Sequence, residues 1–122
     1  MYGVPADLDL SKFLHQELDV LGLAQRSLHF QFENGQVLSV EGRWKLVDPS
    51  GRTLDESLEH GSSVANHGEM RLQNLLGQTV TATKTHPPHS ISLHFDRGHE
   101  LRIFDSSENF ESFHIYPDEI HI

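Results

Sequence analysis

The sequence predicts an α+β fold that consists mainly of antiparallel β-sheet, with one short helix near the N-terminus. Residues 27–40 and residues 90–103 share one pattern, in which apolar and polar residues alternate on both sides of an acidic-X-Gly turn. Apolar residues at helical spacing precede the first of these segments. The chain has 122 residues, enough for one domain with a modest core. We therefore expect a single domain, residues 1–122, with two related hairpin units.

The first half predicts a helix followed by three strands. Apolar residues at helical spacing indicate a helix over about residues 10–21: Leu10, Phe13, Leu14, Leu18 and Leu21. Gly22 would end this helix, and Asp9 or Ser11 would cap it. Strands over about 27–33 and 36–41 form the first hairpin, and a third strand covers 43–47 before a turn at 48–51.

The second half begins after a polar segment, residues 52–70, which predicts a loop between the two halves. One helical turn that ends at Gly77 and a strand over 79–84 follow it. Prolines make residues 85–89 a loop, because proline cannot donate a hydrogen bond to a sheet. The second hairpin and closing strands over 110–115 and 119–122 complete the domain. The internal repeat then covers about residues 21–48 and 76–115.

Alternation also predicts which side chains of the two hairpins are buried. Residues that point to the same face of a strand are two positions apart. The predicted core of the first hairpin is Leu28, Phe30, Phe32, Leu38 and Val40, and that of the second is Ile91, Leu93, Phe95, Leu101 and Ile103.

Composition limits the classes of protein to which the chain can belong. It has no cysteine, which excludes disulfides, thiolate metal sites and a cysteine nucleophile. No leader pattern and no apolar run of membrane-spanning length are present, so we expect a cytoplasmic protein that does not bind membranes. The net charge of −9 argues against binding to nucleic acid and favours a basic protein as partner.

The strongest candidate for a binding surface is an acidic and aromatic strip near the C-terminus. Aromatic anchors surrounded by charge of one sign are typical of an interface that attracts an oppositely charged partner. The candidate protein-binding residues are Phe104, Asp105, Glu108, Phe110, Glu111, Tyr116, Asp118 and Glu119. An exposed edge strand of such a sheet would also allow a homodimer.

Histidines offer an alternative function as a metal- or small-ligand-binding module. The chain has ten histidines, and imidazole is a common metal ligand. The candidate ligands are His86, His89, His94 and His99. No established metal-binding motif accompanies them, so exposed histidines on a solvated sheet face are the preferred interpretation, and metal binding is kept as the alternative. The main hypothesis includes no cofactor.

An enzymatic function is the third hypothesis. Ser62 and Ser63 lie between His60 and His67 in the polar loop, which places a nucleophile and a base close together in sequence. No Gly-X-Ser-X-Gly or comparable motif surrounds them. We therefore expect a protein without enzymatic activity.

Several short motifs resemble those of a widespread family of small bacterial proteins of unknown function. The similar residues are Leu76-Gly77-X-X-Val80, Leu93-X-Phe95-Asp96-X-Gly98-X-X-Leu101, Phe110-Glu111-Ser112-Phe113 and Pro49-Ser50-Gly51. Family members carry a Tyr-Glu-Ser-Trp-like element where this chain has Phe110 and Phe113. The resemblance implies a two-hairpin β-rich fold and leaves the function open. By analogy with small bacterial proteins of this kind, we expect an immunity protein or inhibitor that neutralises a basic toxin, such as a nuclease, by occlusion.

Overall fold

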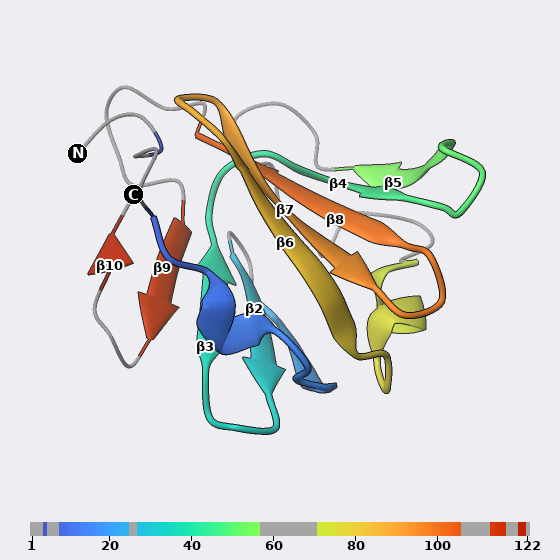
Figure 1. Cartoon of the computed structure of the whole chain (residues 1–122), viewed down its shortest axis with the longest axis horizontal. Coiled ribbons are helices and arrows are strands. Elements are labelled where there is room, and N and C mark those ends of the chain that lie inside the picture. Colours follow the sequence, from blue (N-terminus) through green and yellow to red (C-terminus); the bar gives the residue numbers. More distant parts are fainter. Residues whose placement is uncertain are drawn as a thin grey trace.

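The protein consists of two five-stranded antiparallel sheets, seen in a computed structural model (Figure 1). The structure describes residue 4 and residues 8–24, 27–56, 71–105, 113–116 and 120–121. The prediction of a mainly antiparallel sheet is confirmed. In the part of the chain that is described, the only helical elements are short 3-10 turns, and none is long and apolar enough to cross a membrane.

The strands are grouped in two successive units of the chain. The N-terminal unit contains the 3-10 turn η1 (Ser11–Phe13) and strands β1 (Leu18–Leu23), β2 (Leu28–Phe32), β3 (Val37–Val40), β4 (Trp44–Val47) and β5 (Thr53–Glu56). The C-terminal unit contains the 3-10 turn η4 (Leu72–Leu75) and strands β6 (Val80–His86), β7 (Ser90–Phe95), β8 (Glu100–Phe104), β9 (Phe113–Tyr116) and β10 (Ile120–His121).

The two units exchange their last two strands. The first sheet has the order β1-β2-β3-β9-β10, and the second sheet has the order β5-β4-β8-β7-β6. Strand β4 therefore leaves its own unit and pairs with β8, while β9 leaves the C-terminal unit and pairs with β3. Each sheet is completed by strands from the other half of the chain.

Backbone hydrogen bonds join the first strands of the two units in a nearly symmetric way. Glu17 and Thr79 form an isolated antiparallel bridge between them. Around this bridge each hydrogen bond has an equivalent in the other unit. The bond from His15 N to Val80 O (2.8 Å) is equivalent to that from Gly77 N to Leu18 O (2.9 Å). The bond from Val80 N to Gln16 O (3.0 Å) is equivalent to that from Leu18 N to Gln78 O (2.9 Å). The structural equivalence of the two units thus includes η1 and η4. It begins before residue 21, which is the start of the repeat predicted from the sequence.

The predicted helix over residues 10–21 is wrong. Only Ser11–Phe13 is helical, and Leu18–Leu23 is strand β1, so the α+β class is not confirmed. A β-bulge in β1 explains the helix-like spacing, because Leu18 pairs with Phe32 and Leu21 with Phe30. The extra residue of a bulge allows side chains three positions apart to point to the same face.

The predicted loop over residues 52–70 is also partly wrong. Its first residues form β5, which pairs with β4 along the edge of the second sheet. Residues 57–70 lie outside the described part of the chain. The hairpins β2–β3 and β7–β8 and the helical turn before Gly77 lie where the sequence predicts them.

One hydrophobic core is shared by both sheets. All ten core residues predicted from the hairpins are buried, each at most 2% exposed. Trp44 and Leu46 of β4 and Phe113 and Ile115 of β9 add to this core from the exchanged strands. Since these residues fill the space between the sheets, the side chains that alternate with them lie on the outer faces.

Candidate functional site

The outer face of the second sheet carries an in-register row of charged and polar residues. Strand pairing places Glu56 beside Lys45, Lys45 beside Arg102, Arg102 beside Ser92, and Ser92 beside Lys84. Directly paired residues lie on the same face of a sheet, about 5 Å apart between neighbouring strands. Together with Arg43, which precedes β4, this row concentrates four of the nine lysines and arginines of the chain on one face. We call this surface the basic face: Arg43, Lys45, Lys84 and Arg102.

A hydrogen-bonded network fixes the centre of the basic face. The Ser92 hydroxyl donates to Oε2 of Glu100 (2.8 Å), and Arg102 donates to the same oxygen from Nε (3.1 Å) and Nη2 (2.8 Å). Nε2 of His86 lies 3.3 Å from the Ser92 hydroxyl oxygen. The side chain of Arg102 is therefore held against the sheet by Glu100 rather than extended into solvent.

The same network lowers the pKa of Glu100 below its ordinary value. Partial burial alone would raise this pKa, but the hydrogen bonds from Ser92 and Arg102 and the charge of Arg102 outweigh that effect. Glu100 is consequently a carboxylate at neutral pH and neutralises much of the charge of Arg102.

The free cations of the face lie on either side of this centre. Of the residues that the structure describes, neither Lys45 nor Lys84 takes part in an ion pair. The guanidinium of Arg43 lies 5.2 Å from the ring centroid of Phe104, a cation–π contact. The backbone N–H of Phe104 also donates to the carbonyl oxygen of Arg43 at 2.9 Å. Phe104 is half-buried here, so an aromatic surface borders the charged row.

Ser92, His86 and Glu100 are the residue types of a catalytic triad, but their arrangement differs from one. In a triad the carboxylate accepts a hydrogen bond from the imidazole, whereas Glu100 accepts one from the serine hydroxyl. The side chain of Ser92 is also fully buried, with 0% exposed, so a substrate carbonyl could not reach its oxygen. These three residues form a structural network at the centre of the face.

The equivalent face of the first sheet has different chemistry. Among the described side chains, its in-register row contains Gly22, His29 and Ser39, with no lysine or arginine. The two sheets thus share an architecture but not a surface.

The predicted C-terminal strip is not gathered in one place by the described residues. Phe104 lies at the basic face, and Asp105 donates its backbone N–H to the carbonyl oxygen of His89 at 2.8 Å. Tyr116 ends β9, where it pairs with Val37 of the first sheet. The remaining members lie outside the described residues: Glu108, Phe110, Glu111, Asp118 and Glu119.

The four candidate metal ligands are spread along the β6–β7 hairpin and beyond it. His86 and His89 lie at one end of β7, whereas His99 follows the turn at its other end and contacts Gln78 Nε2 through Nδ1 (3.1 Å). His94 lies between Ala82 and Glu100 on the outer face. Within the described ranges, no three histidine, aspartate or glutamate side chains converge on a position suited to a metal ion.

Sequence reasoning missed the basic face, because its residues are scattered along the chain. Lys45 and Arg102 become neighbours only through the exchange of β4 into the second sheet. The candidate nucleophiles Ser62 and Ser63, with His60 and His67, lie outside the described residues. Alternation alone does mark Arg43, Lys45, Lys84 and Arg102 as outward-facing, which is the one signal that could have suggested a shared surface.

Comparisons with protein-family models, curated proteins and solved structures found no match. The site is therefore interpreted from its own chemistry.

Proposed function

We propose that this protein is a non-enzymatic binding protein that docks a partner protein on its basic face. The observation that carries the proposal is the in-register row Glu56–Lys45–Arg102–Ser92–Lys84, which places three cations and one carboxylate on one outer sheet face of a chain with a net charge of −9. A local positive surface on an acidic protein favours a partner with acidic side chains at matching positions.

Three features favour a protein partner over a small anion. The Arg102 guanidinium and the Ser92 hydroxyl already bind Glu100, so they are not available to surround a small ligand. Lys45 and Lys84 are separated by the strands that carry Arg102 and Ser92, and this spacing suits separate contacts on a broad surface. Arginine and aromatic residues, such as Arg43 and Phe104, are the types enriched among the strongest contributors to protein interfaces.

Occlusion of a toxin is the biological role that we propose for such binding. The expectation of a basic toxin depends on the C-terminal strip, whereas the basic face would contact acidic groups of the same or another partner. Binding through the C-terminal strip would weaken when its negative charges are reversed, whereas binding through the basic face would weaken when its positive charges are reversed. Charge variants of each surface therefore distinguish the two.

Binding to a purified partner tests the proposal. Partners are identified by comparing what wild-type protein and the Arg43→Glu/Lys45→Glu variant retain from a soluble extract of the source organism, and the best candidate is then purified. We expect the double variant to bind this partner at least about tenfold more weakly, because two attractions become repulsions. The control is His29→Glu/Gln31→Glu, which adds two negative charges, half the charge change of the double variant, to exposed positions of the first sheet.

If the control lowers the affinity for the partner as much as the double variant does, binding depends on the total charge of the protein and not on the basic face. Equal affinity of wild type and the double variant for every purified partner would overturn the proposal.

A further inference from the structure

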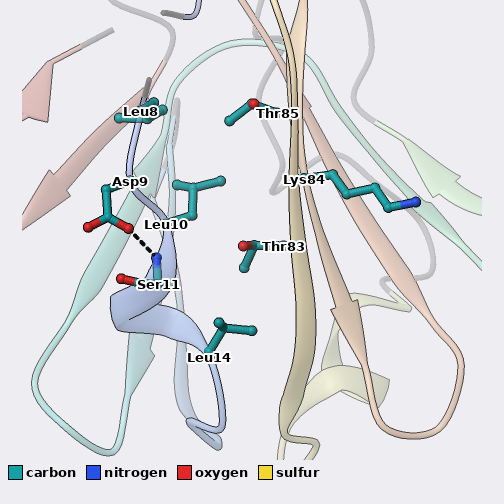
Figure 2. Close-up of a pocket in the computed structure, with 8 residues that line it drawn as sticks. All are labelled: Leu8, Asp9, Leu10, Ser11, Leu14, Thr83, Lys84 and Thr85. Carbon is teal, nitrogen blue, oxygen red and sulfur yellow. Dashed lines mark hydrogen bonds between the residues drawn. The ribbon is translucent and has the colours of Figure 1, made fainter. Parts of the chain in front are cut away.

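The outer edge of β6 borders an open cavity. Strand β6 is the last strand of the second sheet and pairs with β7 on one side. On its other side, His15 and Gln16 bond to Val80 at the start of β6. Beyond the other end of β6, the N–H of Val4 bonds to the carbonyl oxygen of Pro88 (3.0 Å) in the turn that leads to β7. Between these points, residues 8–14 stand away from β6 and leave a cavity of about 230 Å³ (Figure 2). We call this cavity the slot.

The two walls of the slot have different chemistry. Leu8 and Leu14 contribute partly exposed apolar side chains from the N-terminal segment, whereas Leu10 of the same segment is buried in the core, and Thr83 and Thr85 line the β6 side. Asp9 is held by the backbone N–H of Ser11 (2.9 Å), and its carboxylate points away from β6 in Figure 2. Lys84 points away from the N-terminal segment, toward the basic face (Figure 2).

Among the described residues, no other strand bonds to the stretch Thr83–Thr85 on the outer side of β6, and an edge of this kind next to a cavity is suited to an added strand. Alternate residues of an edge strand direct their N–H and C=O groups away from the sheet, so the stretch Thr83–Thr85 offers at least one such pair of groups. The chain itself already forms backbone hydrogen bonds to this edge, where His15 and Gln16 bond to Val80. The volume is below the roughly 300–1,000 Å³ of a cavity for a drug-sized ligand, which favours a short stretch of peptide that passes through it.

We infer that the slot binds an extended peptide segment of a partner protein with the pattern apolar–acidic–apolar. The residue opposite Lys84 would lie on the outer face, where an acidic side chain would meet an ammonium group that has no ion-pair partner among the described residues. Its two neighbours would point to the opposite side, where Leu8 and Leu14 are the partly exposed apolar residues of the lining. This inference rests on the proposed function and deepens it by naming the partner's chemistry at the edge of the basic face. It shares Lys84 with that face and otherwise depends on residues of the slot.

The test uses two peptides that differ only in the central charge, acetyl-Thr-Val-Asp-Val-Thr-amide and acetyl-Thr-Val-Lys-Val-Thr-amide. Each is titrated into the full-length, isotopically labelled protein, and backbone amide shifts are followed by NMR. We expect the aspartate peptide to shift the amides of β6 and to bind about fivefold more tightly than the lysine peptide, as a cross-strand charge pair predicts.

Matched variants separate the slot from the basic face. Lys84→Glu should reverse the preference between the peptides, whereas Lys45→Glu, which lies in the same row away from the edge, should leave it unchanged. Leu14→Trp should fill the slot and abolish binding. Leu76→Trp is its control, because Leu14 and Leu76 both follow a 3-10 turn and take the same extended conformation in their respective units.

Three outcomes would overturn the inference: no binding of either peptide, equal binding of both, or shifts centred away from β6. If Leu14→Trp unfolds, the reversal by Lys84→Glu still decides the question. If Arg43→Glu/Lys45→Glu binds the partner weakly and neither peptide binds the wild-type protein, the slot is excluded as a peptide site. The proposal that the basic face docks the partner would then still stand.

Discussion

His15 and Gly77 take the same left-handed backbone conformation, with φ angles of +65° and +83°. Each follows the 3-10 turn of its own unit, and each donates its N–H to a carbonyl oxygen in the other unit, on Val80 and Leu18 respectively. The chain therefore meets the same backbone requirement twice, once with glycine and once with histidine. Since a left-handed conformation costs most non-glycine residues roughly 1–2 kcal/mol, the two halves differ in strain.

Exchanging the residue types at these positions should move stability in opposite directions. We expect His15→Gly to raise the free energy of unfolding by about 0.5–1 kcal/mol and Gly77→Ala to lower it by about 1–2 kcal/mol. Urea denaturation measures both. His29→Gly in strand β2 is the control, and it should destabilise by about 0.5–1 kcal/mol. A loss of stability in His15→Gly would show that the histidine side chain outweighs its backbone strain.

The two hairpin turns give a second matched pair. Gly35 and Gly98 have φ angles of +91° and +94°, but only Gly98 is crowded: a Cβ atom there would lie 2.9 Å from Cβ of Pro49. Gly35→Ala should cost about 1 kcal/mol, and Gly98→Ala about 1–3 kcal/mol more, because overpacking adds to the strain. Denaturant midpoints of the two variants measure the difference. Equal midpoints would mean that the turn at Pro49 moves away at little cost.

The network around Glu100 predicts a dependence of stability on pH. The folded state lowers the pKa of Glu100, so its contribution is present above the ordinary value of 4.5 and is lost as pH falls through the folded pKa. Glu100→Gln should reduce stability at pH 7 by about 0.5–1 kcal/mol and flatten the curve between about pH 5 and 3. Denaturation across this range is the measurement, with Glu56→Gln, an exposed carboxylate of the same face, as control. A parallel loss at all pH values would exclude ionisation as the cause.

The C-terminal strip predicts a separate effect on partner binding. If the partner is basic, simultaneous neutralisation of Glu108, Glu111, Asp118 and Glu119 to amides should weaken association and reduce its dependence on salt. Titration calorimetry at low and high salt measures both. Unchanged affinity and salt dependence in this variant would remove the strip as a binding surface and with it the expectation of a basic toxin.

Local patterns in the sequence predicted the hairpins and their core, because alternation and turn glycines act over a few residues. They failed at β1, because a bulge gives Leu18 and Leu21 a helix-like spacing. They also failed at β5, because Leu54 and its polar neighbours form a strand only by pairing with β4. The basic face was beyond local reasoning. It exists because β4 crosses to the other sheet and places Lys45 next to Arg102.

Footprinting of the complex tests the central proposal most directly. Hydroxyl radicals modify phenylalanine and histidine side chains that solvent can reach, and mass spectrometry locates the modified residues. Phe104 and His86 lie at the basic face, and His29 lies on the outer face of the first sheet. The account predicts that a bound partner protects Phe104 and His86 and leaves His29 as reactive as in the free protein. Protection of His29 with unchanged reactivity of Phe104 and His86 would place the partner on the other sheet and contradict the account.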